Sequence, residues 1–372
     1  MKYYLLLFIT LHSIVQCKNQ AKKHKKELVN KSFIKYAKGF DIVIDGNEKK
    51  LVLKRMFQTS NKQQTFILGN ETNVIENKIK TPIQSIVLTS TNHVPILELL
   101  NTESSLIGFP NTQYISSKIT RDRIKKGKIM ELGIKQEINT EKLIDLKPDL
   151  VIGYSLYQNN KLYKYLKKIN IPVILNSDWL EESPLGRAEW IKFFGVLYGK
   201  EKEADSIFSK IESEYLRVKS LVKNYKNKPT VISGNMFKDI WNVPAGNSYL
   251  ALFFKDANLN YAWKDTQGTG SLNLNFESVV EKGKNTDFWL NCGLFETMDQ
   301  LKKSNSIFKN FKSFNNNNIY TIAHRKGETG GLIYFELSPM RPDLVLKDLI
   351  KITNPSLLDD YELTFFSKLK YP

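Results

Sequence analysis

The chain has 372 residues and a formal net charge of +17 at pH 7, and 41% of its residues are hydrophobic. This length allows two domains with cores of their own, and nothing after the first 11 residues is long and apolar enough to span a bilayer. A strongly basic balance favours nucleic acid, an anionic membrane surface or an anionic ligand as partner. No nucleic-acid-binding motif is present, so we expect no nucleic-acid partner.

The N-terminus is typical of a secretory signal. Lys2 precedes a short apolar run over residues 3–11, far below the roughly 20 residues of a membrane helix. Cys17 follows, which resembles a bacterial lipobox, where the thiol is acylated. We therefore expect residues 1–17 to be a signal peptide with a lipidated Cys17 and residues 18–38 to be a flexible tether. A soluble secreted protein cut nearby is the alternative. An acylated Cys17 leaves Cys292 without a disulfide partner, and we expect Cys292 to be a buried core residue.

Residues 39–80 are expected to form a small β extension. Apolar and polar residues alternate over 40–44, 50–53 and 65–68, as in half-buried strands. Asp45, Gly46 and Asn47 join the first two runs and are typical of a tight hairpin turn. The segment is therefore predicted to be an antiparallel sheet attached to the domain that follows.

Residues 81–182 alternate short apolar runs with amphipathic segments, which predicts an N-terminal α/β lobe. Strands alternating with helices are typical of a parallel sheet covered on both faces. The predicted strands cover 83–89, 104–108, 150–153 and 171–175, and the predicted helices cover 94–100, 140–146 and 162–169.

Residues 183–227 are expected to be a helical segment. Ser183 followed by Pro184 is a typical helix start, and Gly199 is expected to interrupt the helix. Apolar residues then recur at three- and four-residue spacing from Ala204 to Val222, which predicts a helix of about 22 residues, roughly 33 Å long. We interpret this helix as a strut that joins two lobes. An ordinary long surface helix is the alternative.

Residues 228–372 repeat the same order of elements and end in a last helix. Val87 corresponds to Val231 and Asp149 to Asp287 at similar spacings. The predicted fold class is therefore α/β, with two Rossmann-like lobes that contain parallel sheets, one long α-helix joining them, and the N-terminal β-hairpin extension. The predicted strands cover 229–233, 286–290 and 319–322, and the predicted helices cover 248–255, 275–281, 308–311 and 342–353.

Residues 139–152 read NTEKLIDLKPDLVI, a Glu opening a helix that ends in Lys-Pro-Asp and runs into an apolar strand. With RPDLVLKDLI at 341–350 and the segment 183–200, this resembles the ABC-importer substrate-binding proteins for iron–siderophore, haem and cobalamin. The resemblance covers roughly residues 81–355 and leaves the β extension outside. It implies a monomeric lipoprotein of the periplasm or cell envelope that captures an iron complex, ferric siderophore or haem, and delivers it to an ABC permease. The complex is cargo, and no cofactor is expected.

In that family one Glu on each lobe docks against arginine pockets of the permease. The matching residues are Glu141 and Glu277, each at the start of a predicted helix. A carboxylate there is favourable for its helix, and two on one rim give a two-point charge match to a basic partner. The alternative is that both merely serve their own helices.

The ligand is expected between the lobes, where the strands of parallel sheets end. Aromatic and Arg side chains suit a large, flat or anionic iron complex. His93 and His324, one in each lobe, are candidates to flank a haem iron. The predicted cleft residues are His93, Tyr154, Tyr157, Trp179, Trp241, Trp263, His324, Arg325 and Glu336, and Asp178, Phe237, Tyr334 and Phe335 also follow strands.

Other functions remain open at this point. Cobalamin or another corrinoid suits the same resemblance, and so does a surface lipoprotein that scavenges its ligand without transport. An enzyme is not expected, because the sequence lacks G-x-S-x-G, P-loop, H-E-x-x-H and C-x-x-C motifs. A receptor for a bare metal ion is not expected either, because only His93 and His324 lie beyond the signal and tether.

Overall fold

The computed structural model describes residues 33–46, 48–58, 62–70, 77–133, 138–154 and 160–371. The predicted signal peptide, the lipidated Cys17, most of the tether, Asn47 and Tyr157 lie outside these ranges. Both lobes belong to one compact unit that begins at Ser32. Within the described ranges, every helix is too short or too polar to cross a membrane.

The N-terminal extension is a four-stranded sheet in the order β1-β2-β3-β4. The first three strands pair antiparallel, as predicted, and β4 adds to β3 in parallel. Phe40 on its inner face lies 4.7 Å from the ring of Trp190, between ring centroids, so the sheet packs on the helical segment. The strands are β1 (Phe40–Asp45), β2 (Glu48–Leu53), β3 (Gln64–Gly69) and β4 (Lys78–Lys80).

The N-terminal lobe contains a five-stranded sheet in the order β7-β6-β5-β8-β9, and all its strand pairs are parallel, as predicted. β5 spans three residues rather than the predicted seven, and α2 and β7 were not predicted. The strands are β5 (Ile86–Leu88), β6 (Leu106–Phe109), β7 (Met130–Glu131), β8 (Leu150–Gly153) and β9 (Val173–Leu175). The helices are α1 (Val94–Leu99), α2 (Lys118–Lys125), α3 (Thr140–Asp145) and α4 (Lys161–Lys168).

The helical segment contains three helices, α5 (Pro184–Ala188), α6 (Ile191–Tyr198) and α7 (Glu201–Leu221). The Ser183 hydroxyl caps α5 by accepting the Gly186 N–H at 3.0 Å. Gly199 ends α6 in the left-handed conformation at φ 66°, which confirms the predicted interruption. The stretch before Gly199 is two helices, because the backbone turns between Ala188 and Ile191.

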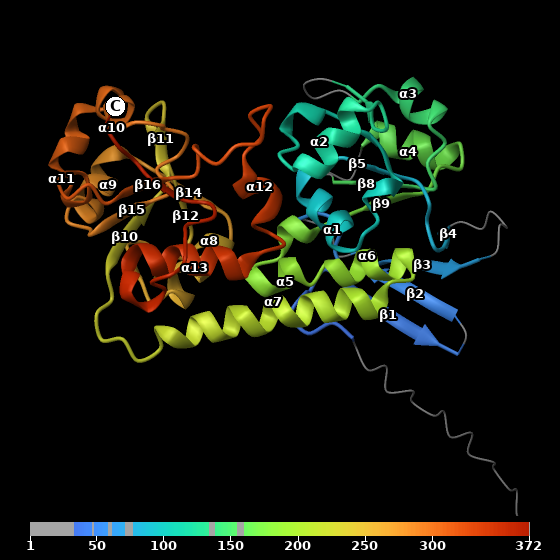
Figure 1. Cartoon of the computed structure of the whole chain (residues 1–372), viewed down its shortest axis with the longest axis horizontal. Helices are drawn as coiled ribbons and strands as arrows, with labels where there is room; N and C mark the ends of the chain where they lie inside the picture. Colours follow the sequence, from blue (N-terminus) through green and yellow to red (C-terminus); the bar gives the residue numbers. More distant parts are fainter. Residues whose placement is uncertain are drawn as a thin grey trace, which may run out of the picture. The chain divides into compact units, whose positions relative to one another are not determined.

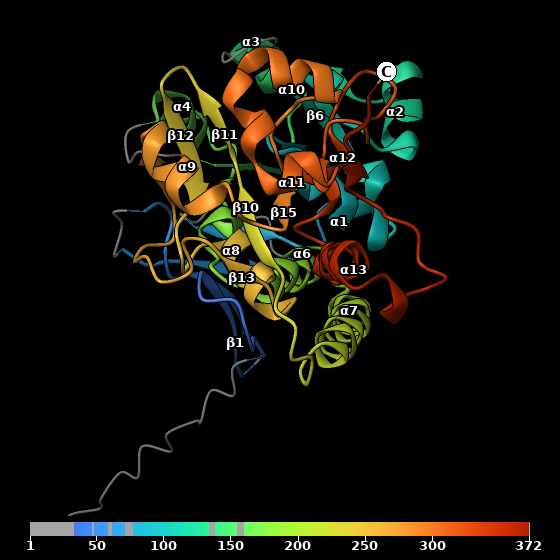
Figure 2. The same ribbon diagram turned by 90° about the vertical axis from the view of Figure 1, so that its left-hand side faces the viewer.

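The long helix α7 has 21 residues and connects the cores of both lobes. Its first half buries Phe208 and Ile211 in the core of the N-terminal lobe, and its second half buries Tyr215 and Val218 in the core of the C-terminal lobe. Figure 1 shows α7 passing below both lobes, and Figures 1 and 2 show α13 lying beside it. The prediction of a strut is therefore confirmed.

The C-terminal lobe contains a sheet in the order β13-β10-β15-β16-β17, in which only β17 is antiparallel to its neighbour. A second sheet, β11-β12-β14, is antiparallel and was not predicted. The predicted helix at 308–311 is instead the 3₁₀ turn Ser306–Asn310. The strands are β10 (Thr230–Ser233), β11 (Asn235–Phe237), β12 (Ile240–Pro244), β13 (Asn260–Tyr261), β14 (Ser271–Leu274), β15 (Phe288–Leu290), β16 (Ile319–Thr321) and β17 (Ser367–Lys368). The helices are α8 (Tyr249–Asp256), α9 (Phe276–Gly283), α10 (Met298–Ser304), α11 (Lys312–Asn315), α12 (Ile333–Leu337) and α13 (Pro342–Thr353).

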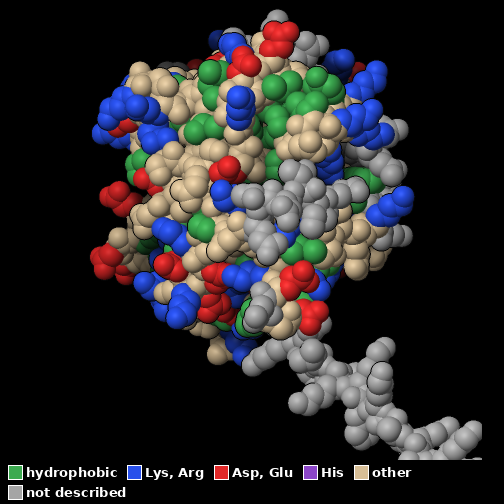
Figure 3. Space-filling model, turned by 90° about the vertical axis from the view of Figure 1, so that its right-hand side faces the viewer, with side chains coloured by type: hydrophobic (Ala, Val, Ile, Leu, Met, Phe, Trp, Pro, Cys, Tyr) green, Lys and Arg blue, Asp and Glu red, His purple; other side chains and the backbone are tan. Residues whose placement is uncertain are grey.

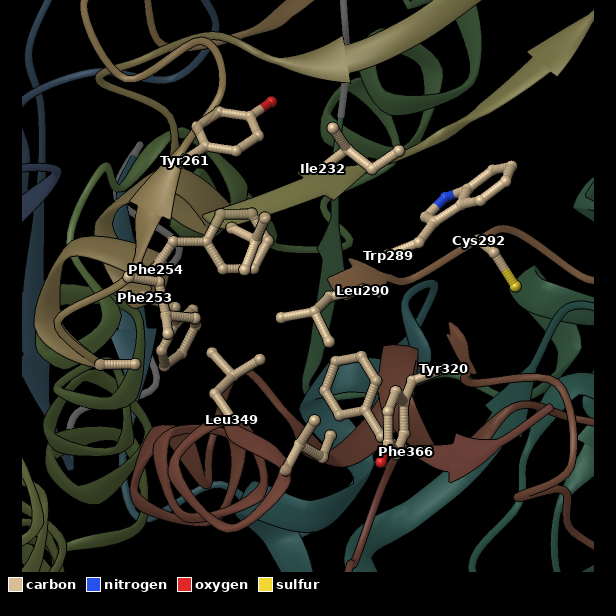
Figure 4. Packing of buried hydrophobic residues seen from close by; sticks show 14 of the residues in the cluster. Ile232, Phe253, Phe254, Tyr261, Trp289, Leu290, Cys292, Tyr320, Leu349 and Phe366 are labelled. Atoms are coloured by element: carbon tan, nitrogen blue, oxygen red, sulfur yellow. The ribbon is translucent and has the colours of Figure 1, made fainter. Parts of the chain in front are cut away.

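The core of the C-terminal lobe joins its sheet to the helices on one side. Leu290 of β15, Phe254 of α8 and Leu349 of α13 point toward one another (Figure 4). Cys292 is fully buried in the same core, as predicted, and burial raises the pKa of its thiol to about 12. The thiol therefore stays protonated and packs as a small apolar group.

Both lobes use the same set of hydrogen bonds, which we call the tie, between the starts of two neighbouring parallel strands: β5 and β8 in the N-terminal lobe, and β10 and β15 in the C-terminal lobe. The Asp149 carboxylate accepts the backbone N–H groups of Gln84 and Ser85, and the Asp149 N–H donates to the Ser85 hydroxyl at 3.0 Å. In the other lobe, the Asp287 carboxylate accepts both the N–H and the hydroxyl of Thr230, and the Asp287 N–H donates back to that hydroxyl at 2.9 Å. The repeated Asp positions are therefore structurally equivalent.

The positive charge of the chain is spread over the surface on the face shown in Figure 3. Lys and Arg side chains occur there in several groups, with Asp and Glu between them. Many lysines have an acidic neighbour, for example Lys49 with Glu201 and Lys219 with Asp256. On this face the surplus of lysines forms a solvated surface rather than one continuous basic patch.

Candidate ligand-binding site

Exposed apolar side chains follow the carboxyl ends of parallel strands in both lobes. In open α/β sheets this edge is where ligands bind. Ile119 on α2 and Tyr165 on α4 are exposed apolar residues elsewhere in the N-terminal lobe. The residues in the segments that follow these strands, with their exposed fractions, are Tyr114 after β6 (58%), Tyr154 after β8 (48%), Phe237 at the end of β11, which follows β10 (68%), Leu294 after β15 (62%) and Phe335 in α12, which follows β16 (57%).

Two of these side chains come from neighbouring segments of the C-terminal lobe. A Cβ atom on Gly293 would lie 2.7 Å from Cγ of Asn235, so the loop after β15 touches the start of β11. Leu294 follows Gly293 in this loop, and Phe237 is the last residue of β11. The Lys238 ammonium lies 5.8 Å from the centroid of the Phe237 ring. This edge therefore offers apolar surface beside a positive charge.

In the N-terminal lobe, a buried polar cluster follows β5 and β9. The Asp178 carboxylate accepts the Asn92 side-chain amide at 2.6 Å and lies 3.2 Å from Nε2 of His93. Burial opposes ionisation of Asp178, but the attraction of His93 and Arg187 outweighs it and holds the pKa of this carboxyl below its usual value. Asp178 is therefore an anion inside the protein.

Arg187 of α5 connects this cluster to the C-terminal lobe. Its guanidinium carbon lies 3.7 Å from the centroid of the Tyr249 ring in α8, and its Nη2 donates to the Trp179 carbonyl at 3.0 Å. Burial raises the pKa of Tyr249, so its hydroxyl stays neutral. That hydroxyl has no hydrogen-bond partner in the part of the chain that the structure describes. The cation–π contact between Arg187 and Tyr249 thus links α5 of the helical segment to α8 of the C-terminal lobe.

The structure corrects the predicted ligand contacts of Trp241 and Trp263. Trp241 is fully buried, its indole N–H donates to the Ser233 carbonyl at 3.2 Å, and its ring lies 5.1 Å from that of Trp289. Trp263 is 3% exposed and packs on Tyr261. The reason is the unpredicted sheet β11-β12-β14, which turns Trp241 inward. Both tryptophans belong to the hydrophobic core.

The two histidines are not a matched pair. His93 is 1% exposed and lies 5.3 Å from the Phe194 ring, between centroids. His324 is exposed, and its Nε2 lies 2.6 Å from the Glu296 carbonyl. His93 follows the first strand of its sheet, whereas His324 follows β16, whose counterpart in the other lobe is β9. The structure thus gives no support to a haem iron held between them.

The remaining predicted cleft residues have different surroundings. Tyr154 is exposed, Trp179 is half-buried, and Arg325 is exposed with Nη2 donating to the Leu363 carbonyl at 2.9 Å. Their contact with a ligand stays a prediction. Glu336 is 2% exposed and binds backbone groups of the opposite lobe, so it is an interlobe contact. Tyr114, which follows β6 by five residues, is a further exposed aromatic that the sequence analysis did not predict.

The predicted docking residues occupy equivalent places in the two lobes. Glu141 is exposed in the first turn of α3, which Asn139 caps by accepting the Lys142 N–H at 2.9 Å. Glu277 is exposed in the first turn of α9, capped in the same way by Asn275. Each helix is followed by one of the two equivalent Asp residues, Asp149 before β8 and Asp287 before β15. Their role toward a permease stays a prediction.

The described residues contain no metal-binding cluster, and the largest-volume hollow among those near the β extension lies away from the carboxyl edge. Within the described ranges, no group of three or more His, Cys, Asp or Glu side chains is placed to hold a metal ion. A hollow of about 610 Å³ lies between β3, β4 and the start of β9, lined by Phe66, Lys168 and Pro172 among others. It lies at the amino end of β9 and is therefore not part of the carboxyl edge.

Comparison with known proteins agrees with this geometry. A sequence model of the periplasmic binding protein family matches residues 86–325. An uncharacterized lipoprotein of Methanocaldococcus jannaschii is 27% identical over 340 residues, which cover 88% of this chain and 78% of that protein. The match to the family model spans more than half of the chain and begins after the β extension.

Two solved structures share the fold at low identity. A possible iron-binding periplasmic solute-binding protein from Staphylococcus epidermidis has a TM-score of 0.58 and 19% identity, covering 74% of this chain and 100% of its own. The periplasmic haem-binding protein of Vibrio cholerae has a TM-score of 0.55 and 15% identity, and the match covers 71% of this chain and 99% of that protein. The two-lobe structure and the family match together show that this chain belongs to the periplasmic binding protein family.

Proposed function

We propose that the chain is the substrate-binding lipoprotein of an ABC importer. It captures an iron complex, a ferric siderophore or haem, between its lobes and delivers the complex to the permease. The family supports the binding role, and structural neighbours described as iron-binding and haem-binding proteins support the class of cargo. The family consists of binding proteins rather than enzymes, so the chain changes no bond in its cargo.

The observation that carries this proposal is the exposed apolar edge shared by the two lobes. Tyr114 of the N-terminal lobe and Phe237 and Leu294 of the C-terminal lobe are each more than half exposed, although burying apolar surface is favoured by roughly 25 cal/mol per Å². A ligand with an aromatic or aliphatic shell would cover these side chains, whereas a bare metal ion would not. Lys238 and Arg325 add positive charge for an anionic complex.

The proposed location is the outer side of a membrane, with Cys17 as the acylated anchor. A related protein described as a lipoprotein supports this assignment. The residues after Cys17 then tether the binding unit near its permease.

Binding is tested by titrating the purified protein with haemin and with a ferric hydroxamate. The double variant Tyr154→Ala with Phe237→Ala should weaken binding at least tenfold, because it removes exposed rings from the edges of both lobes. The matched control is Ile119→Ala with Tyr165→Ala, which removes side chains of comparable exposure from α2 and α4. Equal affinity in all three proteins, or no binding of either iron complex, would overturn the proposal.

A further inference from the structure

Residues 326–336 form a strap that runs from the C-terminal lobe to the N-terminal lobe. The strap follows β16 and includes the start of α12, which lies between the lobes in Figure 1. It rests on residues 113–117, which follow β6 and which we call the seat. Strap and seat both come after the carboxyl ends of parallel strands, so their contact crosses from lobe to lobe on the side where cargo is proposed to bind.

The buried end of the strap is the Glu336 carboxylate. Glu336 is 2% exposed, and its two oxygens accept the backbone N–H of Ser116 at 2.7 Å and of Ser117 at 2.8 Å. Hydrogen bonds to an ionised group are about twice as strong as neutral ones. If the strap moves away, two backbone donors of one lobe and a carboxylate of the other lose their partners together.

The tip of the strap is shaped to the seat by glycines. Its turn is closed by the Gly327 N–H, which donates to the Gly331 carbonyl at 2.8 Å. A Cβ atom on Gly327 would lie 2.5 Å from Cα of Ser116, and one on Gly331 would lie 2.2 Å from the Tyr114 carbonyl oxygen. Both distances are shorter than real Cβ contacts, so only glycine lets the two backbones approach this closely.

Polar contacts surround the tip. The Thr329 hydroxyl donates to the Gln113 carbonyl at 2.8 Å, and the exposed Glu328 pairs with the exposed Lys125 at 2.7 Å and with the buried Arg121 at 3.4 Å. The pair with Lys125 lies in water and contributes little, and the pair with Arg121 is long, so these contacts guide the tip more than they hold it. The strap therefore has one strong buried contact at Glu336 and a weaker set at its turn.

We propose that this strap is a latch: seated on residues 113–117, it holds the two lobes together on the cargo side, and it must leave the seat for cargo to enter or leave. The identity of the cargo rests on the proposed function. The latch itself is a property of this chain and can be tested without any ligand.

The ligand-free test is amide hydrogen exchange of the full chain, followed at Ser116 and Ser117. Glu336→Gln should speed exchange at these two amides at least tenfold, because the variant puts a neutral amide where two donors need a carboxylate. Glu328→Gln, which changes an exposed side chain of the same strap, should alter the exchange rates at Ser116 and Ser117 less than twofold. Amides of β10 report that the fold is intact. Unchanged exchange at Ser116 and Ser117 in Glu336→Gln would overturn the latch.

A locked strap keeps the proposal testable even if Glu336→Gln fails to fold. Gln113→Cys with Thr329→Cys puts one thiol on the seat and one on the strap, at two residues already in contact through the Thr329 hydroxyl and the Gln113 backbone carbonyl, and intact mass verifies the disulfide. Haemin or ferric hydroxamate should dissociate at least tenfold more slowly from the oxidised form, with reduction restoring the original rate. Unchanged dissociation would overturn the latch. If the unmodified protein binds neither probe, the proposed function fails, while hydrogen exchange still decides whether the strap opens.

Discussion

Ser116 of the N-terminal lobe donates its backbone N–H to the buried carboxylate of Glu336 in the C-terminal lobe at 2.7 Å. These residues are 220 positions apart in the chain, so their contact depends on the placement of both lobes. The lobes are connected a second time by α7, whose two halves are buried in the two cores. A rigid helix and a buried polar contact both oppose large changes in the angle between the lobes.

We therefore expect cargo binding to change the overall dimensions very little. A helix that is packed in both cores does not bend as a flexible strand hinge does. The radius of gyration expected from the chain length is roughly 20 Å. Small-angle X-ray scattering of the ligand-free and the haemin-bound protein should give two radii of gyration that differ by no more than about 0.5 Å. A clearly larger difference in the radius of gyration, as a hinge closure of the lobes would produce, would contradict the rigid connection.

The docking prediction concerns Glu141 and Glu277. Reversing both to Lys should abolish uptake of the iron complex, because two attractive contacts with a basic permease surface become repulsive. Binding of the complex to the purified protein should be unchanged. The control reverses Asp145 and Glu281, which are exposed farther along the same two helices. Normal uptake by the Glu141→Lys, Glu277→Lys protein would refute the assignment.

The tie made by Asp287 should contribute measurably to stability. Asp287→Ala removes the acceptor of the Thr230 N–H and hydroxyl and breaks the pair with Lys312 at 2.7 Å. We expect the free energy of unfolding to fall by about 2 kcal/mol in denaturant titrations. Asp265→Ala, a change at an exposed carboxylate, should cost less than about 0.5 kcal/mol. Equal costs for the two variants would show that the tie is not structural.

The contact between α7 and α13 should depend on pH through Glu214. Hydrogen bonds from Arg217 and Lys347 lower the pKa of Glu214 from 4.5 to about 2. A lowered pKa means that the folded state holds the proton less tightly, so this stabilisation is full above about pH 5 and is lost as the pH falls toward 2. The side chain is partly exposed, so the effect is limited to about 1 kcal/mol.

Glu214→Gln is the matching experiment. The unfolding free energy of the unmodified protein should exceed that of the variant by a constant amount between pH 6 and 8, and this difference should fall to less than half by about pH 2.5. A difference that is undiminished at pH 2.5, or that is absent at pH 7, would show that the carboxylate does not carry the effect.

Much of the fold is predictable from the sequence because its signals are local. The three- and four-residue spacing from Ala204 to Val222 predicts α7, and Gly199 marks where it begins. The apolar run Leu150–Gly153 predicts β8 with correct bounds, and the other apolar runs predict where parallel strands occur but not their ends. By contrast, β17 has two residues, and its pairing with β16 depends on a partner far away in the chain, which local patterns do not record.

The site was harder to predict because exposure is a property of the whole lobe. The strand-end rule placed Phe237 and Trp241 together, yet the structure leaves Phe237 68% exposed and fully buries Trp241. The two lie on either side of the turn between β11 and β12, and only the packing of that sheet decides which faces water. Glu336 was predicted to contact ligand for the same reason, although its partners are Ser116 and Ser117.

The most direct test of the central claim is to purify the protein from its native cells and record its visible absorption and the masses of its bound small molecules. The account predicts one iron complex for each chain, either haem with its visible absorption band or a ferric siderophore of defined mass. Protein that carries a corrinoid, or that carries no iron after growth under conditions in which the cells take up iron complexes, would contradict it.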